Sequence, residues 1–328
     1  MLLFMDKPRT LLEGVTYFSD PDNCLNFLVS RRWPDGVVKC PTCNGAHVRF
    51  DRKRRIFECN KKHPKRQFSV KVGTIFEDSP LGLDKWLPTV WMIANAKNGI
   101  SSHEIHRAIG VTQKTAWFML HRIRLAMQAK TGGSLGTDGA EVEVDETYIG
   151  GKARNMNIRQ RGAIGMKRGG AFAGKVAVMG LLQRTDGDRK SKVRTKIVQN
   201  VRKHVLREQI AQNVEDGATI YSDALMSYRD LGLYYDHKVI DHAERYVDGQ
   251  IHTNGLENYW SLLKRGLNGT YVSVEPFHLF RYLDEQAFRF NERKANDSER
   301  FSEVIGQIVG RRLTYKDLIG FGNAPNGN

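Results

Sequence analysis

The stretch EVEVDETYIG, residues 141–150, alternates acidic and apolar side chains before it ends in glycine. Alternation with a period of two is typical of a strand with one buried face. Two more strands, a helix, a further strand and a further helix are predicted after it. These segments are GKVAVMGLLQR (174–184), KVRTKIVQN (192–200), VRKHVLREQIAQNV (201–214), ATIYSDA (218–224) and LMSYRDLG (225–232). This order predicts an α/β domain of the RNase H-like fold over residues 141–293.

Two aspartates stand at the ends of predicted strands. Asp145 comes late in the first strand and Asp223 near the end of the fourth, and both follow apolar strands, VEVD and TIYSD. Because these strands can be neighbours in a mixed sheet, both carboxylates are expected at one edge of it. A third carboxylate, Glu257, lies on a predicted helix. Converging carboxylates repel one another unless cations neutralise them, so the three predict a site for two Mg²⁺ (or Mn²⁺) ions and phosphoryl-transfer chemistry.

Other interpretations of these carboxylates stay open at the level of sequence. Each could be a solvated side chain at a strand end or a helix cap. Glu143, Glu146 and Asp230 are competing carboxylates. By strand alternation Glu143 shares a face with Asp145, whereas Glu146 faces the opposite way.

The predicted helix NGLENYWSLLKRG, residues 254–266, offers two candidates for the third ligand. Glu257 is favoured because Mg²⁺ prefers a carboxylate to a neutral amide. Asn254, one turn earlier, is either a helix cap or a further contact to metal-bound water or the scissile strand. Lys264 lies two turns after Glu257 on the same face and is expected to hold a DNA phosphate, with Arg265 next to it. Trp260 is expected to pack inward.

A zinc ribbon is predicted over residues 36–79. Its ligand candidates are Cys40, Cys43, Cys59 and His63. Fifteen residues separate the CxxC pair from a second Cys/His pair, with a strand–turn–strand pattern between them. This layout is typical of two zinc knuckles on two hairpins. A module this small needs the metal, since it cannot bury enough apolar surface alone. His47 is a weaker candidate for the fourth ligand, and Cys24 is expected to be a small core residue.

Residues 80–130 are predicted to be helical. SSHEIHRAIG begins with a Ser-x-x-Glu capping pattern, and VTQKTAWFMLHRIRLAM begins with a Thr112 cap after Gly110. Two helices joined by a short glycine-containing turn predict a helix-turn-helix, although a plain three-helix bundle would have the same pattern. The residues expected to contact DNA here are Gln113, Lys114 and Thr115.

The chain of 328 residues has a net charge of +15, which favours a polyanionic partner and, among these, DNA. Further basic residues expected to contact DNA are Arg52, Lys53 and Arg54 in the ribbon, and Lys152 and Arg154 in a glycine-rich basic loop. No apolar run approaches the ~20 residues of a membrane-spanning helix, so a cytoplasmic protein with no membrane partner is expected. A helical segment over 1–35, a linker over 129–140 and a C-terminal tail over 294–328 complete the expected organisation.

Several motifs together resemble those of the DDE-type insertion-sequence transposases. They are EVDETYIGGK (143–152), YSDALMSY (221–228) and HTNGLENYWSLLKRGLNGTY (252–271). The order of ribbon, helix-turn-helix and catalytic domain is similar to that of the ISXO-like group, the insertion-sequence family numbered fifteen ninety-five. RRWPDGVVKCPTC, FSVKVGTIFEDSPLGLDKW and VTQKTAWFMLHRIRLAM resemble its N-terminal half, so the likeness spans roughly residues 10–295.

The resemblance implies DNA transposition by a cut-and-paste or copy-based route, Mg²⁺ dependence, and recognition of terminal inverted repeats. Asp145 and Asp223 match the first two acidic positions of the family. Its third position is Glu or Asn with a lysine downstream, so Asn254 and Glu257 both stay open. A prokaryotic, nucleoid-associated protein is implied, acting as a homodimer or higher oligomer because two element ends must be joined. The alternatives are a non-catalytic DNA-binding regulator and a structure-specific nuclease without a joining step.

Overall fold

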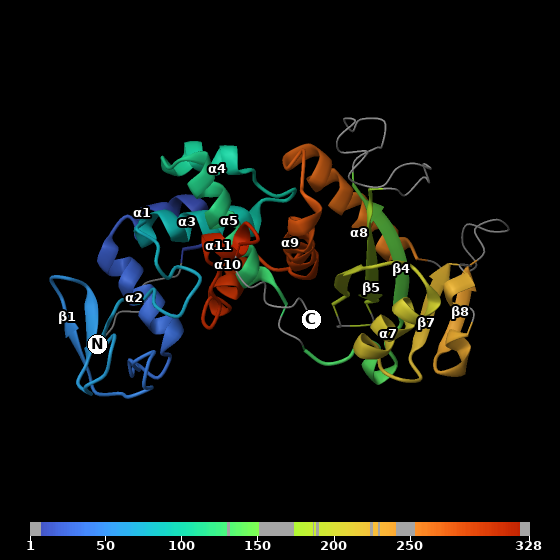
Figure 1. Cartoon of the computed structure of the whole chain (residues 1–328), viewed down its shortest axis with the longest axis horizontal. Helices are drawn as coiled ribbons and strands as arrows, with labels where there is room; N and C mark the ends of the chain where they lie inside the picture. Colours follow the sequence, from blue (N-terminus) through green and yellow to red (C-terminus); the bar gives the residue numbers. More distant parts are fainter. Residues whose placement is uncertain are drawn as a thin grey trace. The chain divides into compact units, whose positions relative to one another are not determined.

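The computed structural model describes residues 8–129, 132–150, 174–185, 187, 190–223, 226–228, 230–240 and 253–321 (Figure 1). The chain forms two compact units. The first unit consists of residues 1–128 and 292–328, and the second of residues 129–291. The division falls at the start of the glycine-rich stretch that was expected to be a linker.

The first unit begins with two helices and a small sheet. Helices α1 (Leu11–Phe18) and α2 (Pro21–Arg32) precede strands β1 (Val48–Asp51), β2 (Ile56–Cys59) and β3 (Gln67–Phe68). The strands pair antiparallel in the order β1-β2-β3, and the pairing of β1 with β2 agrees with the predicted strand–turn–strand pattern. Phe57 of β2 packs against Phe68 of β3 and against Trp33, which follows α2.

Three further helices follow in the same unit: α3 (Leu83–Asn95), α4 (Ser102–Ile109) and α5 (Gln113–Met127). The predicted capping box is present, because Ser101 and Glu104 cap each other's backbone N–H groups at the start of α4. Gly110 ends α4 with a φ of 62°, a left-handed conformation that glycine adopts without strain. Thr112 accepts a hydrogen bond from Thr115 N and thereby caps α5. Local signals therefore place these helix boundaries correctly.

The segment expected to be a C-terminal tail forms α10 (Asp297–Gly306) and α11 (Tyr315–Leu318) and belongs to the first unit. Phe301 of α10 is buried among the rings of Phe18, Phe27 and Trp91. A β-bridge joins Thr74 to Val309. This segment therefore contributes buried residues to the core of the first unit.

The second unit is built on a five-stranded sheet. The strands are β4 (Val142–Ile149), β5 (Val176–Gln183), β6 (Lys192–Val198), β7 (Thr219–Asp223) and β8 (Asp236–Ile240). Their order is β6-β5-β4-β7-β8, with β4, β5 and β6 antiparallel and β7 and β8 parallel to β4. Helix α7 (Lys203–Asn213) joins β6 to β7, as predicted.

The prediction of a helix directly after Asp223 is wrong. Two short 3₁₀ turns, η3 (Met226–Tyr228) and η4 (Leu231–Leu233), lead instead into β8, a strand that the sequence analysis did not predict. The glycine at 232 weakens a helix there. Pairing with β7 stabilises β8, and this pairing is a tertiary interaction.

The two faces of the sheet carry different helices. Val142 and Val144 of β4 pack with Leu206 and Ile210 of α7. The opposite face packs against α8 (Asn254–Arg265) and α9 (Leu279–Asn291). A π-helical turn, η5 (Gly266–Thr270), and a 3₁₀ turn, η6 (Pro276–His278), join these two helices. In EPFHLFRYLDEQAFRFNERK, residues 275–294, helical spacing predicts a core stripe that includes Phe277 and Phe280. These two rings are 48% and 38% exposed, so that prediction is wrong for them.

Candidate functional site

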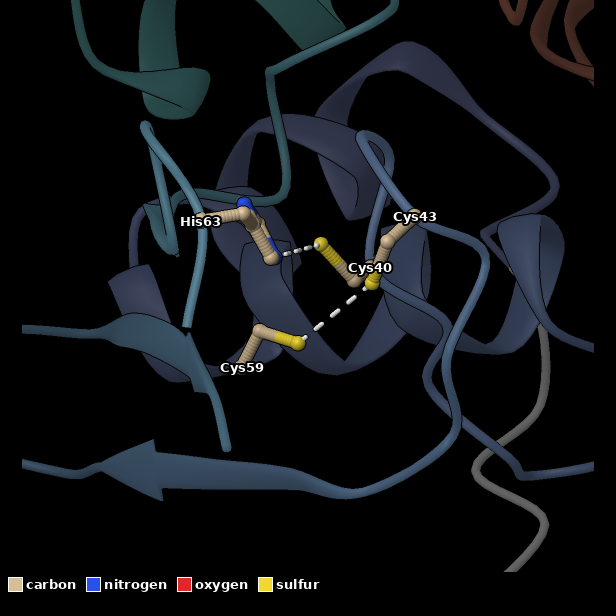
Figure 2. A group of neighbouring side chains, drawn as sticks. All are labelled: Cys40, Cys43, Cys59 and His63. Carbon is tan, nitrogen blue, oxygen red and sulfur yellow. Dashed lines mark hydrogen bonds between the residues drawn. The ribbon is translucent and has the colours of Figure 1, made fainter. Parts of the chain in front are cut away.

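A cluster of three cysteines and one histidine lies beside the small sheet (Figure 2). Its members are Cys40, Cys43, Cys59 and His63, and their ligand atoms all lie within 4.8 Å of one another. The Cys43 and Cys59 sulfurs are 3.6 Å apart, and the Cys40 sulfur is 3.5 Å from Nε2 of His63. A tetrahedral Zn²⁺ site has edges of about 3.8 Å between sulfurs and about 3.6 Å between sulfur and nitrogen. The donor set and its spacing therefore fit Zn²⁺.

Local backbone geometry turns these ligands toward one point. Cys40 N donates to Gly45 O and Asn44 N donates to Cys40 O, which closes the first knuckle. Burial raises the pKa of the Cys40 thiol, but the N–H groups of Cys43 and Thr42 outweigh burial and lower that pKa to about 7. A thiolate is the form that binds metal.

The fourth position of the cluster belongs to His63, whereas His47 is exposed and outside it. Nδ1 of His63 lies 2.7 Å from Pro64 O, which leaves Nε2 directed at the sulfurs. Cys24 is buried elsewhere, within α2, and donates to Phe18 O, as expected of a core residue.

The second unit brings the two aspartates together. Strands β4 and β7 pair in parallel with Glu143 opposite Tyr221. Continuing this register by two residues sets Asp145 beside Asp223. Since residues two apart on a strand share a face, both side chains are on the side of the sheet that carries α8.

Asp145 is the most constrained of these carboxylates. Its Oδ2 accepts a hydrogen bond from Nε1 of Trp260 at 2.8 Å, and its Oδ1 accepts from Glu146 N at 2.8 Å. Burial raises the pKa of Asp145 to about 6, these two donors lower it, and the charges of Asp223 and Glu257 raise it. The charges of Asp223 and Glu257 therefore reach Asp145.

Glu143 holds the start of α8 against the sheet. It is 1% exposed, and its Oε2 accepts from Leu256 N at 2.9 Å while Oε1 accepts from Arg184 Nε at 2.9 Å. This carboxylate satisfies one of the unpaired N–H groups of the first helical turn. Asn254 is the first residue of α8, so it is not the N-cap residue. The N-cap residue is Thr253, and its side chain makes no capping hydrogen bond.

Glu146 faces away from α8, as strand alternation predicted. Tyr228 donates a hydrogen bond of 2.6 Å to its Oε2. Burial raises the pKa of Glu146 to about 7, the Tyr228 hydroxyl lowers it, and Asp223 and Asp145 raise it. Asp230, the remaining competitor, pairs with Lys203 of α7.

The other candidates on α8 are on its surface. Asn254, Glu257, Lys264 and Arg265 are all exposed, whereas Trp260 is buried. The carboxylates of Asp145, Asp223 and Glu257 are not gathered within 4.8 Å of one another, unlike the zinc ligands. Two Mg²⁺ ions lie about 3.5–4 Å apart, and each is about 2.1 Å from its ligands. Their ligand oxygens are therefore spread over a larger distance than the ligands of a single ion. The three carboxylates are donors of the type that Mg²⁺ prefers.

The residues expected to contact DNA have different surroundings. Gln113 donates to Ser102 Oγ at 2.8 Å, and Lys114 lies over the ring of Tyr315. The hydroxyl of Thr115 is hydrogen-bonded to the hydroxyl of Thr112, the N-cap residue of α5. The ribbon residues Arg52, Lys53 and Arg54 are exposed in the turn between β1 and β2. Lys152 and Arg154 lie outside the described residues.

Sequence reasoning assigned Trp260 to packing and missed its hydrogen bond to Asp145. It also left Glu143 as a rival ligand and did not predict its contact with α8. One signal was visible in Gly180, because a glycine inside a strand often marks the close approach of another group. Gly180 pairs with Asp145 across β4 and β5, and the ring of Trp260 lies against it.

Two protein-family models match parts of this chain. Residues 136–291 match the ISXO2-like transposase domain, and residues 19–61 match the transposase zinc-ribbon domain. Over these two segments the chain is therefore similar to insertion-sequence transposases. An uncharacterized protein in transposable element ISH50 of Halobacterium salinarum is 28% identical over 253 residues, which are 74% of this chain and 82% of that relative. No solved structure matches the chain.

The expected resemblance to insertion-sequence transposases is thereby confirmed. A transposase domain implies DNA as the partner, and the zinc-ribbon match together with the Cys₃His cluster supports Zn²⁺ as a bound metal. The matched transposase domain contains Asp145, Asp223 and Glu257. Across the described residues, no helix is long and apolar enough to cross a membrane.

Proposed function

We propose that this protein is a transposase that binds the terminal inverted repeats of an insertion sequence and catalyses Mg²⁺-dependent strand cleavage and strand transfer. One observation carries the proposal. Asp145 and Asp223 are aligned on neighbouring strands of a matched transposase domain, on the face that receives the helix bearing Glu257. The strand order β6-β5-β4-β7-β8 supports an RNase H-like fold for this domain.

Asp145, Asp223 and Glu257 are the residues that would hold two Mg²⁺ ions. Bound there, the ions supply activation of a water or 3′-hydroxyl and stabilisation of the leaving oxygen. Ions held by these carboxylates would lie at the surface of the sheet, beside α8, whose last turn is basic. Lys264 and Arg265 in that turn are suited to hold a DNA phosphate near the reacting bond. Asn254 is a further candidate for contact with the scissile strand.

Recognition of the element ends is assigned to the first unit. The ribbon exposes Arg52, Lys53 and Arg54, which can neutralise phosphates. Helices α4 and α5 supply the helix-turn-helix, with Gln113, Lys114 and Thr115 at the start of the second helix. Two ends must be brought together for transposition, so the active form is at least a dimer on DNA. The protein acts in the cytoplasm, at the nucleoid.

The test compares strand cleavage with end binding. We expect D145N and D223N each to abolish cleavage of a terminal-repeat DNA with Mg²⁺ while gel-shift binding to that DNA persists. D216N, an exposed aspartate in the turn before β7, is the matched control and is expected to cleave normally. A D145N or D223N protein that still nicks the DNA would show that the site is assigned to the wrong residues.

A further inference from the structure

Helix α8 touches strand β4 at two points with matching spacing. Leu256 N donates to Glu143, and Nε1 of Trp260 donates to Asp145. Two residues along a strand span about 6.7 Å, and four residues along a helix span about 6 Å. The two contacts therefore fit a helix that runs alongside the strand in the observed register.

Two glycines allow the helix to come this close. A Cβ at Gly180 would lie 2.6 Å from Cζ2 of Trp260 and 2.8 Å from Cδ2 of Leu256. A Cβ at Gly255 would lie 2.7 Å from Oε2 of Glu143. Distances under 3 Å mean that either side chain would have to move. The indole N–H reaches the carboxylate because both strand and helix lack a side chain at the point of contact.

The indole also determines how Asp145 is presented. One oxygen of the carboxylate accepts from Glu146 N and the other from Trp260, so donors on both oxygens fix the plane of the group. Each oxygen keeps one lone pair for a further partner. Glu257 follows Leu256 directly on α8, so the register that places Trp260 also places Glu257 relative to Asp145.

We propose that Trp260 is a positioning residue, whose indole N–H holds the Asp145 carboxylate in the orientation that binds a divalent cation. This inference rests on the proposed role of Asp145 as a metal ligand. Replacing the indole by a benzyl ring keeps most of the apolar contact but removes the donor, so the carboxylate can rotate. Partners of this kind around a metal ligand typically contribute 10–100-fold in metal affinity.

The experiment measures Mn²⁺ binding to the zinc-loaded full-length protein by isothermal titration calorimetry. We expect W260F to bind Mn²⁺ about 10-fold more weakly than wild type. The Mg²⁺ concentration that half-saturates strand cleavage should rise by a similar factor, with a smaller loss of rate at saturating Mg²⁺. G180A leaves the donor in place but displaces the ring, and it should weaken Mn²⁺ binding in the same direction.

Two controls separate this role from general destabilisation and from failure of the site itself. Trp86 of α3 is 1% exposed, and its Nε1 donates to Ser79 Oγ at 3.0 Å, so W86F removes a comparable buried indole donor in the other unit. W86F should bind Mn²⁺ like wild type. If W260F and G180A also bind like wild type, or W86F is weakened equally, the positioning role is overturned. If D145N itself binds Mn²⁺ as wild type does, the proposed metal site fails instead.

Discussion

At the scale of single residues, the position of the third metal ligand depends on which side of α8 faces the sheet. Leu256 and Trp260 are buried against β4 and β5, and Glu257 acts electrostatically on Asp145. Asn254 begins the helix and is exposed. Glu257 is exposed as well, so the proposed choice of Glu257 over Asn254 rests on the preference of Mg²⁺ for carboxylates.

Substitution of each candidate should distinguish them. We expect E257Q to lower the rate of Mg²⁺-dependent cleavage by at least about 100-fold, because it removes a charged ligand. N254A should lower it far less, since the start of α8 is held by Glu143. Rates are measured on terminal-repeat DNA at saturating Mg²⁺. The opposite ranking, with N254A inactive and E257Q active, would make Asn254 the ligand.

A second residue-scale prediction concerns pH. His237 of β8 lies 2.8 Å from Ser222 Oγ, and burial lowers the pKa of its imidazole below 6.5. The unfolded chain therefore binds a proton at a higher pH than the folded protein does. The contribution of neutral His237 to stability is fully present above about pH 6.5 and is lost as the pH falls below it.

We expect H237Q to flatten this loss between about pH 7 and pH 5. The measurement is hydrogen exchange of the β7 and β8 amides, corrected for the intrinsic pH dependence of exchange. H204Q, on the exposed surface of α7, is the control for histidine replacement. An unchanged acid dependence in H237Q would assign the loss to other groups.

At the scale of elements, the ribbon sheet and α8 are each held by something other than apolar packing alone. The ribbon has three short strands, and the zinc ligands join its two knuckles. Helix α8 is joined to the sheet by a buried carboxylate at its start and an indole hydrogen bond one turn later. In both cases a few polar side chains determine where the element lies, and the local sequence of the element does not predict that position.

The ribbon yields a prediction with a matched pair of histidines. We expect H63A to lower Zn²⁺ affinity by about 10–100-fold or more, because it removes a ligand, and to increase exchange of the β1 and β2 amides. H47A should change neither quantity, since its side chain is outside the cluster. Zinc is measured by competition with a chromogenic chelator. Equal zinc affinity in H63A and wild type would identify a different fourth ligand.

At the scale of the whole molecule, the chain leaves the first unit after Gln128, builds the second unit, and returns to the first at Glu292. The returning segment is part of the fold of the first unit. Phe301 contributes a buried ring to the helices at the N-terminus, and Arg311 donates to the carbonyls of Leu125 and Gln128. The N-terminal unit therefore requires the end of the chain for its core.

This arrangement predicts which unit a C-terminal change will affect. We expect F301A to destabilise the first unit by about 3–5 kcal/mol, the usual cost of deleting a buried phenylalanine ring. Exchange should increase in α1, α2 and α3 but not in β4 or β5. F321A, at a position that is 84% exposed, is the control. Increased exchange in β4 and β5 of F301A would contradict this assignment of the C-terminal helices.

The sequence by itself determined the interactions between residues that are close together in the chain. Three features depend on residues a few positions apart: the capping box at Ser101, the end of α4 at Gly110 and the alternation in β4. The zinc ligands were recognised from their spacing, which is typical of a Zn²⁺ site. Alternation also separated Glu143 and Asp145 from Glu146. These features were predicted correctly because a short stretch of backbone contains the whole interaction.

Tertiary structure decided the contacts that place one element on another. Leu256 N is 113 residues from Glu143, and Trp260 is 115 residues from Asp145. Strand β8 is stabilised by β7, Phe301 is buried by distant rings, and Phe277 stays exposed despite helical spacing. The physical reason is that a side chain's role depends on the surface it meets. For Trp260, that surface is a glycine and a carboxylate on two adjacent strands.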